Sequence, residues 1–281
     1  MKIISNLDLS GYNSYNIKSI AEIAYFPETK EELIEVANNP EAIVIGGGCN
    51  VIFSQNRYRV PFVFIKENYS GIVKKGESLI VKAGTDLKKL SVYAFRHSLT
   101  GLEYYYDIPG CVGGATIMNA GCQGVSFSDY IQKITYYNRK TKDIITISKE
   151  EAEFEYRGNI FNNLSVVILE VELKLKEGIP CNIKRLMKSN KETRWIKQPR
   201  DYPSAGSVFK RPLGHYVGPM VSDCGLKGYT VGGAMVSIKH AGFIINKGFA
   251  TGKDIIELIR IIKNAVYLKF GVLLQEEQKI I

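Results

Sequence analysis

Two glycine-rich segments are the clearest candidates for chemistry in this chain. Gly46-Gly47-Gly48-Cys49-Asn50 directly follows the β-branched run Ala42–Ile45, and Ile108–Ala115 leads into Met118–Gly121. Residues without a Cβ let consecutive amide N–H groups approach a pyrophosphate, so the two segments together predict a binding site for a long dinucleotide. A pair of tight turns needs the same residue types. The GxGxxG pattern fails because Val51 occupies its sixth place, and no P-loop motif occurs.

Composition and charge bound the class of protein. With 45% hydrophobic and 23% charged residues in 281, the chain has the profile of a globular protein rather than a fibrous or disordered one. No apolar run reaches the roughly 18–20 uncharged residues that cross a bilayer. The net charge of +9 attracts anions. Basic residues are densest over Lys184–Arg200 but do not interleave with aromatics as in a nucleic-acid groove, so we expect no nucleic-acid or membrane partner.

The cysteines and the N-terminus indicate a compartment. Five cysteines, an odd number without a CxxC pair, predict thiols outside disulfides in a reducing environment and no metal site. The N-terminus reaches Asp8 before any apolar core of a secretory signal. We therefore expect a cytoplasmic protein.

Local patterns predict the elements that position the glycine segments. Thr29 and Glu32 form a capping box that opens a helix through Ala37, followed by the strand Ala42–Ile45. Further elements are a strand Leu79–Ala83, a helix Leu87–His97, a hairpin of Lys133–Asn138 with Ile144–Ile147, a strand Val166–Leu175, a helix Ile183–Trp195, a linker Gln198–Pro203, and a helix capped by Thr251 and Asp254 that runs to about Lys269. This mixed order predicts an α+β fold.

Beyond the glycine segments, an ordered series of motifs over nearly the whole chain resembles the UDP-N-acetylenolpyruvoylglucosamine reductase family. The most specific are Ala205–Lys210 and Lys239–Phe243. The resemblance implies a three-domain α+β flavoprotein of the short subtype without an inserted tyrosine loop. It implies a PCMH-type, vanillyl-alcohol-oxidase-like pair of FAD-binding domains, at 1–68 and at 69–199 plus 270–281, and a C-terminal α+β substrate-binding domain at 200–269.

The resemblance also implies a reaction. FAD would be bound non-covalently and reduced by NADPH, and the substrate would be UDP-N-acetylglucosamine enolpyruvate of peptidoglycan synthesis, which receives hydride at C3 and a proton at C2. No obligatory protein partner is implied. Two alternatives stay open: an FAD-linked oxidase or dehydrogenase acting on a neutral alcohol, and a basic nucleic-acid-binding module, which would be colourless and steeply salt-dependent.

Residue by residue, the resemblance implies that Arg157 and Glu277 accommodate the charged intermediate and that Ser207 supplies the proton. Arginine offers a planar fork that matches a carboxylate and stays charged. Glu277 helps only if it is protonated or holds Arg157 or water, and Ser207 needs cations or a relay to stabilise its alkoxide. The implied FAD contacts are Ile45, Gly46, Gly47, Gly48, Cys49, Asn50, Val51, Pro109, Gly110, Cys111, Val112, Gly113, Gly114, Asn119, Ala120 and Gly121. The implied substrate contacts are Tyr156, Lys197, Lys210 and Arg211, with Lys239 and His240 as nucleotide contacts unless the histidine is structural.

The chain departs from the family pattern at four places. Lys18-Ser19 replaces a Gly-Gly pair, Cys49 and Asn159 each stand where a serine or similar residue is usual, and Gln275 replaces an acid. We expect these departures to alter local backbone and to leave the chemistry in place.

Overall fold

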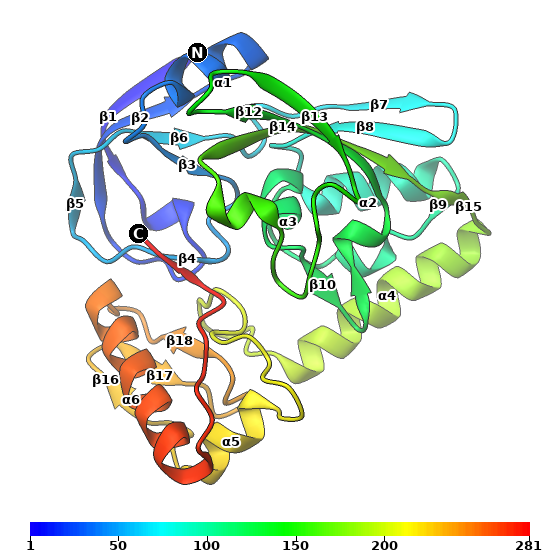
Figure 1. The fold of residues 1–281 in the computed structure, drawn as a ribbon. Coiled ribbons are helices and arrows are strands. Elements are labelled where there is room, and N and C mark those ends of the chain that lie inside the picture. The colour runs from blue at the N-terminus through cyan, green and yellow to red at the C-terminus, as the bar shows by residue number, and fades with distance from the viewer. The chain divides into compact units, whose positions relative to one another are not determined.

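The computed structural model describes residues 1–281 and divides into two compact units (Figure 1). Unit 1 comprises Met1–Ser5, Ile23–Gly47 and Val60–Thr193, and unit 2 comprises Asn6–Glu22, Gly48–Arg59 and Arg194–Ile281. The chain therefore passes between the units several times within its first sixty residues. None of its helices is both long enough and apolar enough to span a membrane.

Unit 1 begins with a small sheet that leads to the first glycine segment. Its central strand is β6 (Phe62–Phe64), which pairs in parallel with β2 (Ile20–Phe26) on one side and with β3 (Ile43–Ile45) on the other. Ala24 lies opposite Phe62, and Ile45 lies opposite Phe64. β1 (Lys2–Asp8) lies beside β2 in the strand order. The predicted capping box is present at the start of α1 (Lys30–Ala37), and the predicted strand ends at Ile45 as expected.

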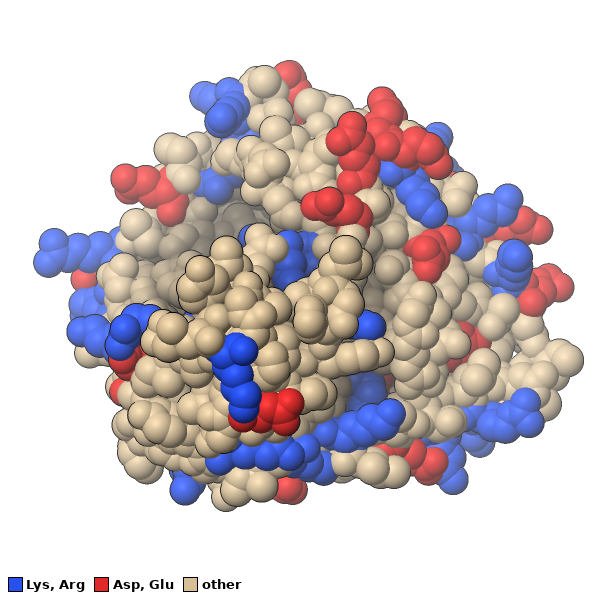
Figure 2. All heavy atoms as spheres, turned by 60° about the horizontal axis from the view of Figure 1, so that its bottom comes forward, with Lys and Arg blue, Asp and Glu red and all other residues tan.

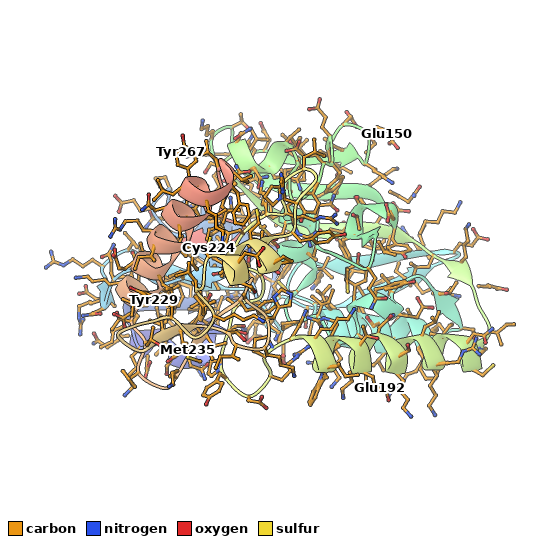
Figure 3. All side chains as sticks on the ribbon, turned by 90° about the horizontal axis from the view of Figure 1, so that it is seen from below. Glu150, Glu192, Cys224, Tyr229, Met235 and Tyr267 are labelled. Atoms are coloured by element: carbon orange, nitrogen blue, oxygen red, sulfur yellow. The ribbon has the colours of Figure 1, made fainter.

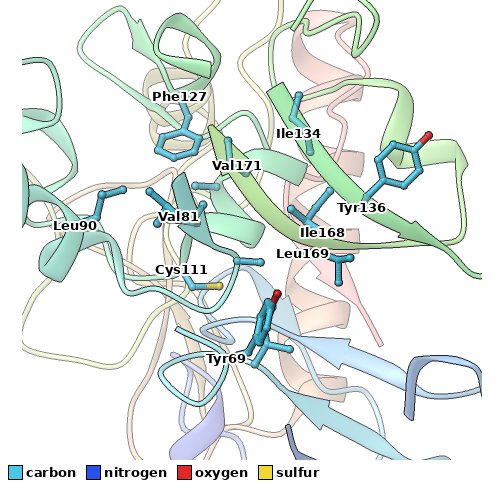
Figure 4. Packing of buried hydrophobic residues seen from close by; sticks show 14 of the residues in the cluster. Tyr69, Val81, Leu90, Cys111, Phe127, Ile134, Tyr136, Ile168, Leu169 and Val171 are labelled. Carbon is cyan, nitrogen blue, oxygen red and sulfur yellow. The ribbon is translucent and has the colours of Figure 1, made fainter. Parts of the chain in front are cut away.

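A five-stranded antiparallel sheet forms the centre of unit 1. Its order is β13 (Ile144–Ser148), β12 (Ile131–Asn138), β14 (Val166–Lys174), β8 (Ser78–Lys82) and β7 (Ile72–Lys75). The predicted hairpin and both predicted strands are confirmed within two residues. Buried apolar residues of this sheet, such as Val81, Ile134 and Val171, pack with Leu90 and Phe127 in the core (Figure 4).

Besides α1, unit 1 contains α2 (Leu87–Arg96), which confirms the predicted helix, and α3 (Val112–Ile117). It also contains most of α4 (Pro180–Lys197), whose last turn belongs to unit 2. The short pairs β9 (Leu99–Thr100) with β15 (Lys176–Glu177) and β10 (Gly121–Cys122) with β11 (Val125–Ser126) complete it. Glu192 projects from the exposed side of α4 (Figure 3). The sequence missed α3, because its glycines indicated a loop, whereas the segment is helical from Val112 onward.

Unit 2 contains a three-stranded antiparallel sheet of β16 (Thr230–Val231), β17 (Ala234–Val236) and β18 (Ile244–Asn246). Two helices accompany it, α5 (Val217–Asp223), which the sequence did not predict, and α6 (Gly252–Phe270), which begins at the predicted Thr251–Asp254 capping box. Figure 3 labels Met235 on β17, Cys224 after α5 and Tyr267 on α6. Residues 198–203 form no helix or strand, as expected of a linker.

The C-terminal segment lies in unit 2. β19 (Lys279–Ile280) pairs in parallel with β4 (Val51–Ile52), and β5 (Arg57–Tyr58) pairs with the first residues of β2. Residues 270–281 thus share a unit with residues 200–269. The physical reason is backbone pairing, since strands far apart in sequence satisfy their N–H and C=O groups on each other.

Candidate functional site

The first glycine segment contains one glycine that the fold itself requires. Gly48 has a φ of +63°, and a Cβ there would lie 1.9 Å from the carbonyl oxygen of Tyr12. The Ser14 N–H also donates a hydrogen bond to the Gly48 carbonyl at 3.0 Å. For Gly48 the tight-turn interpretation therefore accounts for the residue, because only glycine fits both the dihedral angle and the close approach.

Gly46 brings the two predicted glycine segments together within unit 1. A Cβ on Gly46 would lie 2.6 Å from Cys111 Sγ and 3.9 Å from the amide nitrogen of Gly114. The end of β3 and the start of α3 are thus in direct contact, although more than sixty residues separate them. This proximity is what a shared dinucleotide site requires of the two segments.

At the start of α3, two backbone amides donate hydrogen bonds to other parts of the chain and a third does not. The N–H of Val112 donates to the Thr85 carbonyl at 2.9 Å, and the N–H of Gly113 donates to the Ala83 carbonyl at 2.8 Å. Gly114 is exposed, its N–H has no partner in the chain, and a Cβ there would meet only Cys111 Sγ at 3.9 Å. The Gly114 amide is therefore an open hydrogen-bond donor beside Gly46.

Arg157 is held by main-chain carbonyls at the other end of α3. Its two terminal nitrogens donate to the carbonyl oxygens of Asn119, at 3.1 Å, and Gly121, at 3.0 Å. The guanidinium also lies over the exposed ring of Tyr156, 5.2 Å from its centroid. Arg157 adopts a left-handed φ of +57° and Asn119 one of +40°. This backbone is sparsely populated for residues with a side chain, which is common at functional sites.

Hydrogen bonds from two asparagine side chains connect the Arg157 loop to α3 and the residues that follow it. The Asn119 side chain donates to the Glu155 carbonyl at 2.8 Å and accepts from the Ser128 N–H at 3.1 Å. Asn159 donates to the carbonyls of Thr116 and Ile117, the last residues of the helix. The sequence marks Asn159 only as a departure from the family pattern, because nothing local indicates those distant carbonyls. The Asn119 side chain is occupied, so a cofactor would meet its main chain.

In unit 2, Ser207 lies on an extended segment between two others. On one side it forms an antiparallel bridge with Phe243, and the Val208 N–H donates to the Gly242 carbonyl at 3.1 Å. On the other side the Glu277 N–H donates to the Val208 carbonyl at 2.9 Å. Ser207 is exposed and Glu277 is half-buried. The structure thus brings these two predicted residues onto adjacent segments.

The predicted substrate-binding cations of unit 2 have varied surroundings. Lys239 Nζ donates to the Trp195 carbonyl at 2.8 Å, and Lys197 is exposed in the last turn of α4. The Arg211 guanidinium stacks on the ring of Tyr216 at 3.8 Å, and Lys210 is half-buried. Cations are spread over the face drawn in Figure 2, with acids among them. Tyr216 was missed, because no sequence signal links an exposed tyrosine to an arginine.

His240 has a structural contact through one ring nitrogen. Its Nδ1 accepts a hydrogen bond from the Gly242 N–H at 3.1 Å, and its ring meets Phe243 edge to face at 4.8 Å. Burial, with a smaller contribution from Lys227, lowers the pKa of His240 below its usual value. The histidine is therefore neutral, and only Nε2 remains to contact a ligand. No group of three or more His, Cys, Asp or Glu side chains could hold a metal ion.

Comparisons with known proteins agree with one another. The family model described as "FAD binding domain" matches residues 21–147, and that described as "UDP-N-acetylenolpyruvoylglucosamine reductase, C-terminal domain" matches residues 198–281. Proteins named UDP-N-acetylenolpyruvoylglucosamine reductase from Caldanaerobacter subterraneus subsp. tengcongensis and Francisella tularensis are each 37% identical to the chain. These alignments cover 100% and 98% of the chain and 94% and 99% of the relatives. A crystal structure of the reductase from Thermus caldophilus matches with a TM-score of 0.86 and 31% identity, over 100% of this chain and 99% of that one.

Proposed function

Because the chain belongs to the UDP-N-acetylenolpyruvoylglucosamine reductase family, we propose that it reduces UDP-N-acetylglucosamine enolpyruvate to UDP-N-acetylmuramate in peptidoglycan precursor synthesis, with NADPH as reductant. The predicted family and the α+β flavoprotein class are confirmed. The observation that carries the proposal is the match along the whole chain to relatives that bear this name. The three predicted domains, and the assignment of roles to individual residues, belong to the proposal.

FAD supplies a hydride donor, which no amino-acid side chain provides. The fit of the chain to FAD is supported by the contact of Gly46 with the start of α3 and by the open Gly114 amide. We assign the cofactor to the main chain of Ile45–Val51, Pro109–Gly114 and Asn119–Gly121. Within the second of these, Gly114 donates to the pyrophosphate, whereas Val112 and Gly113 hold α3 in place.

Arg157 binds the substrate carboxylate and balances the charge that develops there. Its guanidinium is oriented in advance by the Asn119 and Gly121 carbonyls, so little reorganisation is needed when charge appears. Glu277 assists either in its protonated form or by orienting water. Its backbone is fixed on both sides, by the Val208 carbonyl and by the Asn50 side chain, which donates to the Glu277 carbonyl at 3.1 Å.

Ser207 delivers the proton to C2. A serine hydroxyl is a weak acid, so this role depends on accurate placement and on a partner that stabilises the alkoxide. Its backbone supports the first condition, because the segment is paired on both sides. The cations Lys197, Lys210, Arg211 and Lys239, with Tyr156 and His240 Nε2, bind the UDP-sugar, whose pyrophosphate matches the basic surplus of the chain.

We place the enzyme in the cytoplasm. None of its five cysteines forms a disulfide, which suits a reducing compartment. The precursor that it would act on is a nucleotide sugar.

The decisive experiment follows NADPH oxidation by the purified protein with and without the enolpyruvyl UDP-sugar. We expect a yellow protein with a flavin absorption band, and oxidation that depends on the sugar. Oxidation that ignores the sugar would overturn the proposed substrate and favour the oxidase alternative. A preparation that neither contains nor binds FAD would contradict our assignment of the cofactor site.

A further inference from the structure

A buried side-chain amide lies beneath the segment that carries Ser207. Gln278 is only 3% exposed, and its Nε2 donates to the carbonyl oxygen of Ala205 at 3.0 Å. The same nitrogen lies 3.3 Å from the Gly206 carbonyl and 3.4 Å from that of Ser207. One amide thus contacts three successive carbonyls, all within unit 2.

The other end of the amide is fixed by a tyrosine from the start of the chain. Tyr15 is fully buried, and its hydroxyl donates to Gln278 Oε1 at 2.9 Å. Burial raises the pKa of Tyr15 above its usual value, so the hydroxyl keeps its proton. The Tyr15 carbonyl in turn accepts from the Asn246 side chain at 2.7 Å. The tyrosine is therefore itself held in place.

The orientation of the Gln278 amide follows from the chemistry of its neighbours. Carbonyl oxygens only accept hydrogen bonds, so the NH₂ group must face Ala205–Ser207, and the carbonyl oxygen must face the Tyr15 hydroxyl. A flipped amide would place oxygen against oxygen at three positions. The pair therefore has one satisfied arrangement, and buried networks that are fully satisfied restrict the backbone they contact.

The Gln278 contacts include the residue that precedes the paired segment. Gly206 has a φ of +81°, a left-handed conformation, and glycine has no side chain whose packing could hold it. The residue immediately after it is Ser207. A rotation at Gly206 would move the serine, and a displacement of about 1 Å at a reacting group can cost roughly 100-fold in rate.

We propose that Gln278 and Tyr15 are positioning residues for the proton-donating Ser207, acting by fixing the Ala205–Ser207 carbonyls. The inference rests on the proposed function, because it assumes that Ser207 delivers a proton. Neither residue was singled out by the sequence, since the two are 263 positions apart and meet only in the folded chain.

The test compares Gln278→Met with wild type in the FAD-loaded enzyme, since methionine keeps the length of the side chain and removes its donors. We expect normal reduction by NADPH, and reoxidation by the enolpyruvyl UDP-sugar that is slowed roughly 100-fold, with kcat affected more than KM. Gln275→Met is the matched control, because the Gln275 side chain is exposed in the same segment. It should behave as wild type in both half-reactions.

A second measurement separates positioning from stability. Gln278→Met alone leaves both the buried Tyr15 hydroxyl and the Ala205–Ser207 carbonyls without their Gln278 partner. Tyr15→Phe with Gln278→Met also removes the hydroxyl, so one unpaired buried group fewer remains. We expect the double variant to regain part of the lost melting temperature and to remain slow in reoxidation. Hydrogen exchange of the peptide 203–210 should be faster in both variants. If Gln278→Met fails to fold, the double variant carries the kinetic test.

A double-mutant cycle of Gln278→Met with Ser207→Ala distinguishes the possible outcomes. If Gln278 acts through Ser207, Gln278→Met should add little to the slow reoxidation of Ser207→Ala. Equal slowing in both backgrounds, or an unslowed Gln278→Met, would overturn the positioning role while the proposed function stands. Normal reoxidation of Ser207→Ala would instead remove the proton-donor assignment, and the positioning role with it. Wild-type enzyme that is not reoxidised by the sugar would overturn the proposed function itself.

Discussion

The backbone N–H of Glu277 donates a hydrogen bond to the carbonyl of Val208 at 2.9 Å. Glu277 therefore lies opposite Val208, the residue that follows Ser207. An antiparallel bridge between Phe209 and Glu276 and a bond from the Lys210 N–H to the Gln275 carbonyl continue the pairing. Main-chain atoms make all of these contacts. Substitution of the Ser207 or Glu277 side chain should therefore leave the arrangement intact and report on chemistry.

Ser207→Ala should separate the two half-reactions. Reduction by NADPH needs no proton at C2 of the sugar, so it should be normal, whereas reoxidation by the enolpyruvyl substrate should slow by roughly 100- to 10,000-fold or more. Stopped-flow spectra of the flavin band measure both steps. If only reduction by NADPH were impaired, the proton-donor role would be wrong and Ser207 would be a turn or nicotinamide-contact residue.

Arg157→Ala should retain flavin and lose rate in the second half-reaction. Arg157→Lys should replace it only in part, because one ammonium cannot reproduce the planar fork that contacts both the Asn119 and Gly121 carbonyls. Flavin content and single-turnover reoxidation are the measurements. A lysine variant with wild-type reoxidation would show that charge alone suffices and that the two-point geometry is irrelevant.

Substitutions at Gly114 should distinguish a cofactor glycine from a turn glycine. Gly114→Ala has room for its Cβ, so this variant should fold and keep most of its flavin. Gly114→Asp places a carboxylate beside the open amide, so this variant should lose its flavin. Gly48→Ala should instead lower the free energy of unfolding by at least about 1–3 kcal/mol, from its left-handed backbone and the clash with Tyr12. Flavin absorbance and thermal unfolding measure the two effects. Full flavin content in Gly114→Asp would contradict our assignment of the pyrophosphate.

His240 should make stability depend on pH. Its pKa in the folded chain is lower than its usual value near 6.5, so its contribution is complete above that pH and is lost as the pH falls and the unfolded chain binds the proton more readily. Protonation also removes the Nδ1 acceptor of the Gly242 N–H. Melting temperatures from about pH 8 down to about pH 5.5 measure the loss. His240→Asn, which keeps an acceptor but cannot titrate, should flatten this part of the profile. An identical slope in wild type and His240→Asn would contradict the prediction.

The sequence alone determined the features that depend on neighbouring residues. Both capping boxes, at Thr29–Glu32 and Thr251–Asp254, are local pairs three residues apart, and their helices begin where expected. The β-branched strands and the hairpin of β12 with β13 likewise follow from local pattern. The ordered motifs also identify the family independently of the fold, because each motif is a short contiguous segment.

Tertiary structure decided the features that depend on distant partners. α3 begins inside a glycine segment because its first amides reach Thr85 and Ala83, and no local pattern announces those acceptors. The segment 270–281 belongs to unit 2 because it pairs with residues 208–210 and with β4. The Tyr15–Gln278 hydrogen bond joins two residues that are 263 positions apart in the sequence. A buried polar group must find a partner somewhere, but which partner is near is fixed only when the chain has folded.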